Sequence, residues 1–235
     1  MARAKRSTKR VVRRRLLALG GLLLLVLGGA GWWQAGEWRP ARERFPVQGV
    51  EIGSADGAVN LAALKAAGAD FVYLDASEGA EGRFSAFETD LAAAREAGLQ
   101  VGAVHRFDPC MGADAQVGNF VTVVPRDASL LPPAVGLDLD DQACAAPPAE
   151  AAMQSELTTL INQIEAHSGK PAILKLSRGF EARYHVAAMI DRNLWVSSSY
   201  LAPGYAGRPW VMWTANTRMR SPAADGRLRW VVVRP

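Results

Sequence analysis

The sequence predicts an α/β barrel that follows one N-terminal membrane helix. Three observations support this prediction. A charge-free apolar segment lies near the N-terminus, short apolar runs alternate with helix-forming segments after it, and ionisable residues stand at the ends of those runs. Alternating strands and helices indicate parallel strands joined by crossover helices. The chain beyond the apolar segment has the length of one such domain.

The N-terminal segment has the composition of a membrane anchor. Residues 1–15 contain eight Lys and Arg and no acidic residue, and residues 16–33 contain no charge and end in two tryptophans. A membrane span needs roughly 20 apolar residues, whereas a cleaved signal needs about 7–15 and a small-residue cleavage site. We therefore expect a basic cytoplasmic tail at 1–15, a transmembrane signal-anchor at 16–36 and a linker at 37–46. A cleaved signal peptide is the alternative.

The positive charge of the chain does not indicate nucleic-acid binding. The formal net charge of +4 becomes −4 once the eight basic side chains of the tail are left out. An acidic domain of mixed charge lacks the basic surface that binds nucleic acid. Basic residues next to a membrane span stay on the cytoplasmic side, which accounts for the tail and places the rest of the chain outside the membrane.

Short apolar runs and helix-forming segments alternate along residues 47–235. The predicted strands are Val47–Ile52, Phe71–Asp75, Gln100–His105, Ala134–Asp140, Ala172–Leu176, Leu194–Ser197, Trp210–Thr214 and Arg229–Val233. The predicted helices are Leu61–Ala67, Ala86–Ala97, Ala113–Val123 and Ala151–His167. Eight strands with helices over the first part predict a closed, irregular barrel. An open, doubly wound sheet is the alternative.

Ionisable residues at the ends of the first four strands predict a site at one rim of the barrel. Glu51, Asp75 and His105 end the first three strands, and Asp138 and Asp140 end the fourth. Residues two apart on a strand point to one face, so these two aspartates should project together. Active sites of such barrels lie at the carboxyl ends of the strands. Solvated carboxylates at strand ends are the alternative.

The two cysteines, Cys110 and Cys144, both lie in the part expected to be exported, where thiols tend to be oxidised. We expect them to form a disulfide, with two unpaired buried thiols as the alternative. Neither their spacing nor their neighbours indicate a metal site, so we expect no metal and no other cofactor.

Motifs along residues 47–235 resemble, in order, those of a known enzyme family. GVEI at 49–52 resembles G-(I/V)-D-(V/I), FVYLDASEG at 71–79 resembles F-x-(F/Y)-(I/L)-K-A-(S/T)-E-G, and GAVHRF at 102–107 resembles G-A-Y-H-F-F. AQVGNF at 115–120, LPPAVGLDLD at 131–140 and the Trp-bearing segments at 194–196 and 209–213 follow. On these motifs the region resembles glycoside hydrolase family 25, the Chalaropsis-type lysozymes or N-acetylmuramidases.

The resemblance implies a TIM-like (β/α)5(β)3 barrel that cleaves the β-1,4 bond between N-acetylmuramic acid and N-acetylglucosamine in peptidoglycan. It implies Asp140 as the proton donor, Asp138 as its partner and Glu51 as the third acid of the cluster. Clustered carboxylates raise one another's proton affinity, as a proton donor requires. The implied partner is the peptidoglycan glycan strand. We expect the protein to be a monomer, anchored in the bacterial cell membrane by its N-terminal helix, with the barrel outside the membrane.

Three departures from the family pattern fall at the predicted site. Asp140 is one methylene shorter than the family's Glu, Glu51 is one methylene longer than its Asp, and Asp75 replaces its Lys. A displacement of about 1 Å can lower a rate on the order of 10²-fold. The alternative function is therefore a catalytically impaired, lysozyme-like module that binds glycan or an envelope protein.

Four further residues are predicted to contribute to saccharide binding. Asp75 and His105 stand at the predicted rim, and Trp195 and Trp213 carry aromatic faces that suit the C–H surfaces of sugars. Core packing is the alternative for the tryptophans. For His105 the alternative is a hydrogen-bonded residue behind the site.

Overall fold

The computed structural model describes residues 2–139, 144 and 147–235, which form two compact units divided after Trp38. The first unit is helix α1 (Ala2–Glu37). Its segment Leu19–Glu37, with a mean hydropathy of 1.3, is long and apolar enough to cross a membrane. Length and composition fit a membrane anchor and a signal sequence equally well.

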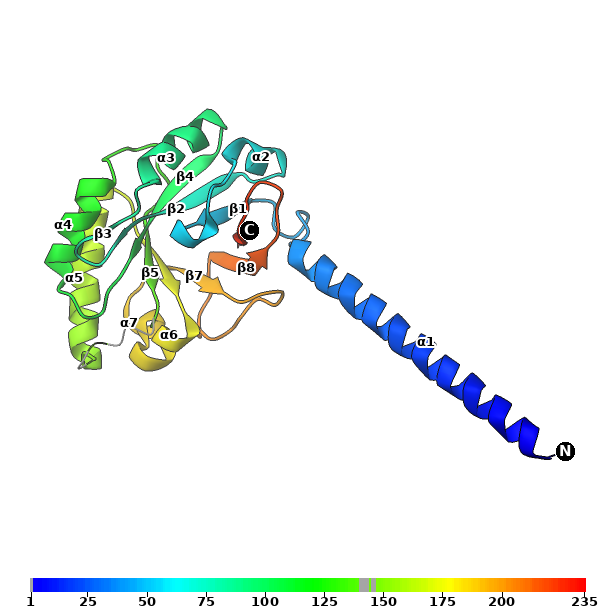
Figure 1. Ribbon diagram of the computed structural model, residues 1–235. Coiled ribbons are helices and arrows are strands. Elements are labelled where there is room, and N and C mark those ends of the chain that lie inside the picture. The colour runs from blue at the N-terminus through cyan, green and yellow to red at the C-terminus, as the bar shows by residue number, and fades with distance from the viewer. Residues whose placement is uncertain (1, 140–143, 145–146) are drawn as a thin grey trace. The chain divides into compact units, whose positions relative to one another are not determined.

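The second unit is a closed barrel with helices outside its strands (Figure 1). In the described part of the chain, eight strands close the ring in the order β1, β9, β8, β7, β6, β5, β4, β2, because β2 also pairs with β1. Only β9 runs antiparallel to its neighbours in this ring. The pairing of β1 on both sides excludes the open sheet. The strands are β1 (Gln48–Ile52), β2 (Phe71–Glu78), β4 (Gln100–Arg106), β5 (Ala134–Leu137), β6 (Ile173–Leu176), β7 (Asn193–Ser197), β8 (Met212–Met219) and β9 (Leu228–Val233).

The helices follow the first five strands of the ring in sequence. They are α2 (Leu61–Ala66), α3 (Phe87–Glu96), α4 (Ala113–Val123), α5 (Glu150–Ser168), α6 (Arg178–Tyr184) and α7 (Val186–Met189), with a short 3-10 helix, η1 (Ser54–Asp56). The sequence predicts α2 to α5 but misses α6 and α7, which are short. Helix α6 begins after Ser177, whose Oγ accepts a hydrogen bond from the Phe180 amide at 3.1 Å. The sequence also misses β3 (Gly82–Arg83), a two-residue strand beside β2.

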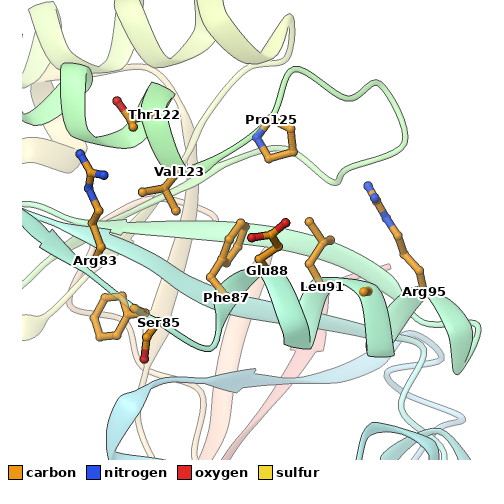
Figure 2. Close-up of a pocket in the computed structure, with 11 residues that line it drawn as sticks. Arg83, Ser85, Phe87, Glu88, Leu91, Arg95, Thr122, Val123 and Pro125 are labelled. Atoms are coloured by element: carbon orange, nitrogen blue, oxygen red, sulfur yellow. The ribbon is translucent and has the colours of Figure 1, made fainter.

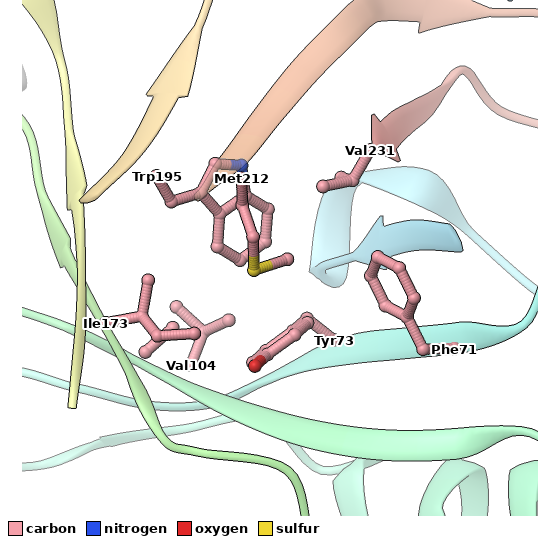
Figure 3. Packing of buried hydrophobic residues seen from close by; sticks show 8 residues of the cluster. Phe71, Tyr73, Val104, Ile173, Trp195, Met212 and Val231 are labelled. Carbon is pink, nitrogen blue, oxygen red and sulfur yellow. The ribbon is translucent and has the colours of Figure 1, made fainter. Parts of the chain in front are cut away.

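Alternation along the strands separates a barrel interior from a surface that faces the helices. A cluster of inward side chains fills the interior, and Tyr73, Trp195 and Met212 gather at its centre (Figure 3). Gly49 and Gly102 leave room for two of its rings. A Cβ at Gly102 would lie 2.2 Å from the ring of Tyr73, and one at Gly49 would lie 2.6 Å from the ring of Phe71. The packed interior closes the barrel below the carboxyl ends of the strands.

The predicted linker belongs largely to the barrel unit, which begins at Arg39. Arg42 forms an ion pair of 3.2 Å with Asp70, at the residue before β2. The buried side chain of Gln48 donates a hydrogen bond of 2.9 Å to the carbonyl of Pro40. These contacts fix the segment to the amino-terminal end of the barrel strands.

The predicted disulfide between Cys110 and Cys144 is confirmed, with a Cα–Cα distance of 5.4 Å. Cys110 lies between β4 and α4, and Cys144 lies between β5 and α5. The bond therefore joins the two loops that follow neighbouring strands at the carboxyl end of the barrel.

Candidate active site

A cavity of about 280 Å³ lies at the carboxyl ends of the barrel strands. Seven ionisable side chains line it, contributed by or directly following six different strands: Glu51, Asp75, Glu78, Arg106, Asp138, Lys175 and Arg229. Of the residues predicted at the rim, Glu51, Asp75 and Asp138 line this cavity, which carries both signs of charge.

Strand alternation explains why these side chains share one cavity. Glu51 lies two residues after Gly49, Asp75 two after Tyr73, and Lys175 two after Ile173, so each follows an inward position of the packed interior. In β2 the pairing with β4 shifts between Asp75 and Ser77, and this irregularity brings Glu78 beside Arg106 at the mouth.

Glu51 is held as a carboxylate by two cations. Its side chain is 2 % exposed and forms ion pairs with Lys175 and with the Nε of Arg229, the latter at 3.2 Å. Burial alone would raise the pKa of Glu51, but the charges of Lys175 and Arg229 outweigh burial and hold the pKa below its usual value. A carboxylate in this state accepts hydrogen bonds but has no proton to donate near neutral pH.

Arg229 also connects the site to the loop after β1. Its Nη2 donates a hydrogen bond of 2.9 Å to Asp56, and its Nη1 donates one of 3.3 Å to the same carboxylate. Asp56 in turn accepts a hydrogen bond of 2.7 Å from the backbone amide of Gly53. Arg229 is thus shared between Asp56 and Glu51, which fixes its guanidinium against the first strand.

Asp75 is the second buried carboxyl of the cavity. Burial and the neighbouring charge of Glu51 raise the pKa of Asp75 to about 6, against the attraction of Lys175, Arg229 and Arg106. Asp75 forms an ion pair with Arg106, whose Nη1 lies 3.9 Å from Oδ2. The two buried carboxyls therefore differ in proton affinity, with Glu51 ionised and Asp75 protonated at mildly acidic pH.

The acid pair of the fourth strand is placed only in part. Strand β5 ends at Leu137, so the expected strand 134–140 is shorter than predicted. Asp138 is exposed and lines the cavity. Its Oδ1 accepts a hydrogen bond of 2.9 Å from the backbone amide of Leu139. Asp140 lies outside the described residues. Its role and its position beside Asp138 stay predictions.

The structure does not place His105 at the cavity. The side chain is fully buried on the helix-facing side of β4, because it alternates with the inward Val104. Its Nδ1 lies 2.9 Å from the Oγ of Ser77 and its Nε2 3.3 Å from the Oε1 of Gln116. Burial lowers the pKa of His105 to about 4, so the ring is neutral. A direct contact of His105 with substrate is not supported; the alternative, a hydrogen-bonded residue behind the site, describes its position.

The two tryptophans predicted to contact sugar are both packed in the protein, Trp195 inside the barrel and Trp213 on the opposite face of the sheet, against Phe45 and Trp210. Trp195 is completely buried and its Nε1 donates a hydrogen bond of 2.8 Å to Thr214. Trp213 is 4 % exposed and its Nε1 donates one of 2.8 Å to the Ser198 carbonyl. Neither lines the cavity. Core packing, the alternative for these residues, accounts for both.

Sequence reasoning missed the cationic half of the site. Lys175 lies at an inward position of an otherwise apolar strand, and a lysine in such a run was the available signal. Arg229 opens the predicted last strand, where a cation could pair with the acids of the rim, but the sequence does not show that its partners are Glu51 and Asp56, far away in the chain. Arg106 follows the inward Val104 by two residues of strand alternation, whereas Glu78 reaches the mouth through the irregular pairing of β2 with β4, which no local pattern predicts.

Replacing Lys175 with methionine is expected to lower the free energy of unfolding by about 3 kcal/mol, because the buried charge of Glu51 loses one of its two cations. Urea unfolding of the full-length protein in detergent micelles measures this loss. The double variant Glu51→Gln/Lys175→Met removes both charges and should recover most of it. Lys65→Met, at an exposed position of α2, is the control and should change stability by less than about 0.5 kcal/mol. An equal loss in the single and double variants would contradict the ion-pair explanation.

A second cavity, of about 630 Å³, lies on the outer surface between α3 and the end of α4 (Figure 2). Phe87, Glu88 and Leu91 of α3 face Val123 and Pro125 across it. It shares no lining residue with the cavity at the carboxyl ends of the strands, and Glu88 is the one acid among its described lining residues.

Comparison with known proteins agrees with this architecture. The family model described as Glycosyl hydrolases family 25 matches residues 50–221. No curated protein matches the sequence. A family 25 glycosyl hydrolase from Bacillus anthracis superposes with a TM-score of 0.75 and 23 % identity, over 83 % of this chain and 91 % of that one.

Two lysozymes have the same fold. The bacterial lysozyme from Streptomyces coelicolor gives a TM-score of 0.70 at 20 % identity, over 80 % of this chain and 91 % of that one. The family 25 lysozyme from Aspergillus fumigatus gives 0.66 at 18 % identity, over 80 % and 94 %. The family match spans most of the barrel, and the acids expected from the motifs that lie in the described residues stand at the carboxyl ends of its strands. The chain therefore belongs to glycosyl hydrolase family 25.

Proposed function

We propose that this protein is a membrane-anchored muramidase that cleaves the β-1,4 bond between N-acetylmuramic acid and N-acetylglucosamine in peptidoglycan. The observation that carries the proposal is the cavity at the carboxyl ends of the strands, into which Glu51, Asp75 and Asp138 bring carboxyl groups. The order of five strand–helix units followed by β7, β8 and β9 supports the TIM-like (β/α)5(β)3 description of the barrel.

In the proposed reaction Asp140 donates its proton to the glycosidic oxygen as the bond from that oxygen to the anomeric carbon breaks. Asp138 supports the positive charge that develops at the anomeric carbon, and a water molecule then adds its hydroxyl there and returns a proton to the carboxylate of Asp140. The position of Asp138 at the cavity supports this assignment. Glu51 keeps its charge between Lys175 and Arg229 and so contributes to the electrostatics of the site rather than a proton.

The proposed anchor is the apolar segment of α1, with the basic tail in the cytoplasm and the barrel, as a monomer, on the outer side of a bacterial cell membrane. The contacts of Arg42 and Gln48 with the barrel unit leave few residues of free tether after the helix. A short tether restricts the barrel to nearby glycan, which favours local cell-wall remodelling. Extraction of membranes with alkaline carbonate tests this part, because a spanning anchor stays in the pellet and a cleaved, soluble domain is released.

The function itself is tested by incubating the full-length protein, in detergent micelles, with purified peptidoglycan and identifying the released fragments by mass spectrometry. Muropeptides with N-acetylmuramic acid at the reducing end are the expected products. Fragments with reducing N-acetylglucosamine would contradict the proposed bond. Binding of peptidoglycan without any product would support the alternative, an impaired glycan-binding module.

A further inference from the structure

Asp75 lies in the cavity with a long ion pair to Arg106, whose Nη1 is 3.9 Å from Oδ2. It is 7 % exposed, and its Oδ1 has no hydrogen-bond partner among the described residues. Buried polar atoms of this kind are uncommon in folded proteins, where protein groups or ordered water usually satisfy them, and an exception indicates a functional role or a bound group. The carboxyl is thus a candidate to contact whatever enters the cavity.

The surroundings of Asp75 favour its neutral form. On β1, Glu51 is ionised, and the two cations near it are already engaged, Lys175 of β6 with Glu51 and Arg229 of β9 with Glu51 and Asp56. The remaining cation, Arg106 of β4, is 3.9 Å away with 39 % of its side chain exposed, where solvent weakens its attraction.

Two further acids line the same cavity, Glu78 at the end of β2 and Asp138 after β5, and both add negative charge when ionised. On the other side of the carboxyl, a Cβ at Gly53 would lie 2.3 Å from Oδ2, so Gly53 leaves the space that the carboxyl occupies against the end of β1. Gly53 therefore makes room for the carboxyl beside Arg229, whose Nη2 would lie 3.0 Å from the same Cβ.

We propose that Asp75 binds the saccharide in its protonated form, with its acid hydroxyl donating a hydrogen bond to an acceptor oxygen of the sugar. A carboxylic acid kept neutral in a buried site is an effective hydrogen-bond donor. The raised pKa of Asp75, about 6, agrees with this arrangement. The inference rests on the proposed function, because it takes the ligand to be peptidoglycan saccharide, and it specifies the protonation state in which Asp75, already predicted to bind saccharide, does so.

A pH dependence of affinity follows. When only the protonated form binds, the apparent dissociation constant rises as that form is depleted. For a group with a pKa of about 6, the constant should rise about 30-fold between pH 5.0 and pH 7.5. Asparagine has the same shape and stays a neutral donor at both pH values.

The test is calorimetric titration of the full-length protein, in detergent micelles, with the disaccharide N-acetylglucosaminyl-β-1,4-N-acetylmuramic acid, which lacks the bond proposed to be cut. The wild-type protein is expected to lose about 30-fold in affinity from pH 5.0 to 7.5. Asp75→Asn should bind equally at both within about twofold, and Asp75→Ala should bind about 10-fold more weakly than wild type at pH 5.0. Asp90→Asn on α3, outside the cavity, is the matched control and should follow the wild type.

Three results would overturn the inference: weak binding by Asp75→Asn at both pH values, which would mean that the ionised form binds; unchanged affinity in Asp75→Ala; or a wild-type affinity that does not depend on pH. The melting temperature of each variant shows whether it is folded. If Asp75→Ala does not fold, the comparison of Asp75→Asn with the wild type still tests the inference. Absence of wild-type binding at both pH values, with no products from peptidoglycan, would instead contradict the proposed function and this inference with it.

Discussion

Replacing Asp140 with alanine is expected to lower kcat on purified peptidoglycan by about 10²–10⁴-fold, the usual contribution of a general acid. The neighbouring Asp138 lies at the cavity, and the motif of residues 131–140 resembles the acid pair of the family. The initial rate of release of reducing ends from full-length protein measures the effect. The melting temperature of the variant is measured as well, so that a loss of folding is distinguished from the loss of the proton donor.

Asp140→Glu makes the comparison more specific, because it restores the family's longer acid. If the shortened side chain limits the wild-type enzyme, the glutamate variant should be at least as active as the wild type. Asp141→Ala is the matched control, since it removes the next acidic residue along the chain and should leave most of the activity. Full activity in Asp140→Ala would assign the proton donor elsewhere, and equal losses in the Asp140 and Asp141 variants would indicate a general effect on this segment.

Removing the disulfide with Cys110→Ser/Cys144→Ser is expected to lower the free energy of unfolding by about 4 kcal/mol. The two cysteines are 34 residues apart in sequence, and closing a loop of this length restricts the unfolded chain by roughly that amount. Urea unfolding of the full-length variant and the oxidised wild-type protein measures the difference. Activity should fall as well, because the bond joins the loop after β4 to the loop that follows Asp138.

A reductant separates the effect of the bond from that of the serines. Dithiothreitol should lower the stability of the wild-type protein to about that of the double variant and leave the variant unchanged. A wild-type protein that keeps its full stability once its thiols are shown to be reduced would contradict this explanation. A variant as stable as the oxidised wild type would do so too.

Much of the barrel could be predicted from the sequence because its signals are local. An apolar run such as Phe71–Asp75 followed by a helix-forming segment specifies a strand and its crossover, and the structure contains all eight predicted strands and the four predicted helices. The boundaries were less certain. The fourth strand ends at Leu137 because the end of a strand depends on the pairing of its neighbours, and here the last pair joins Leu137 to Leu176.

The residues of the site were predictable only as far as strand periodicity reaches. Glu51 and Asp75 were expected at the rim and both line the cavity. His105 was also expected there. Successive side chains of a strand point to opposite faces, and the residues before and after His105 point inward, so His105 faces the helices. An end-of-strand position alone does not say which face the side chain takes.

By itself the sequence determined the apolar N-terminal segment, the order of strands and helices, the resemblance to one enzyme family and the acids at the carboxyl ends of the strands. The tertiary structure alone decided the state of those acids. Lys175 and Arg229 come from strands distant in the chain, yet barrel closure brings both beside Glu51, whereas Asp75 forms a longer ion pair of 3.9 Å with Arg106. The proton affinity of a buried group depends on charges within a few ångströms in space, and in a closed barrel those charges come from every part of the chain.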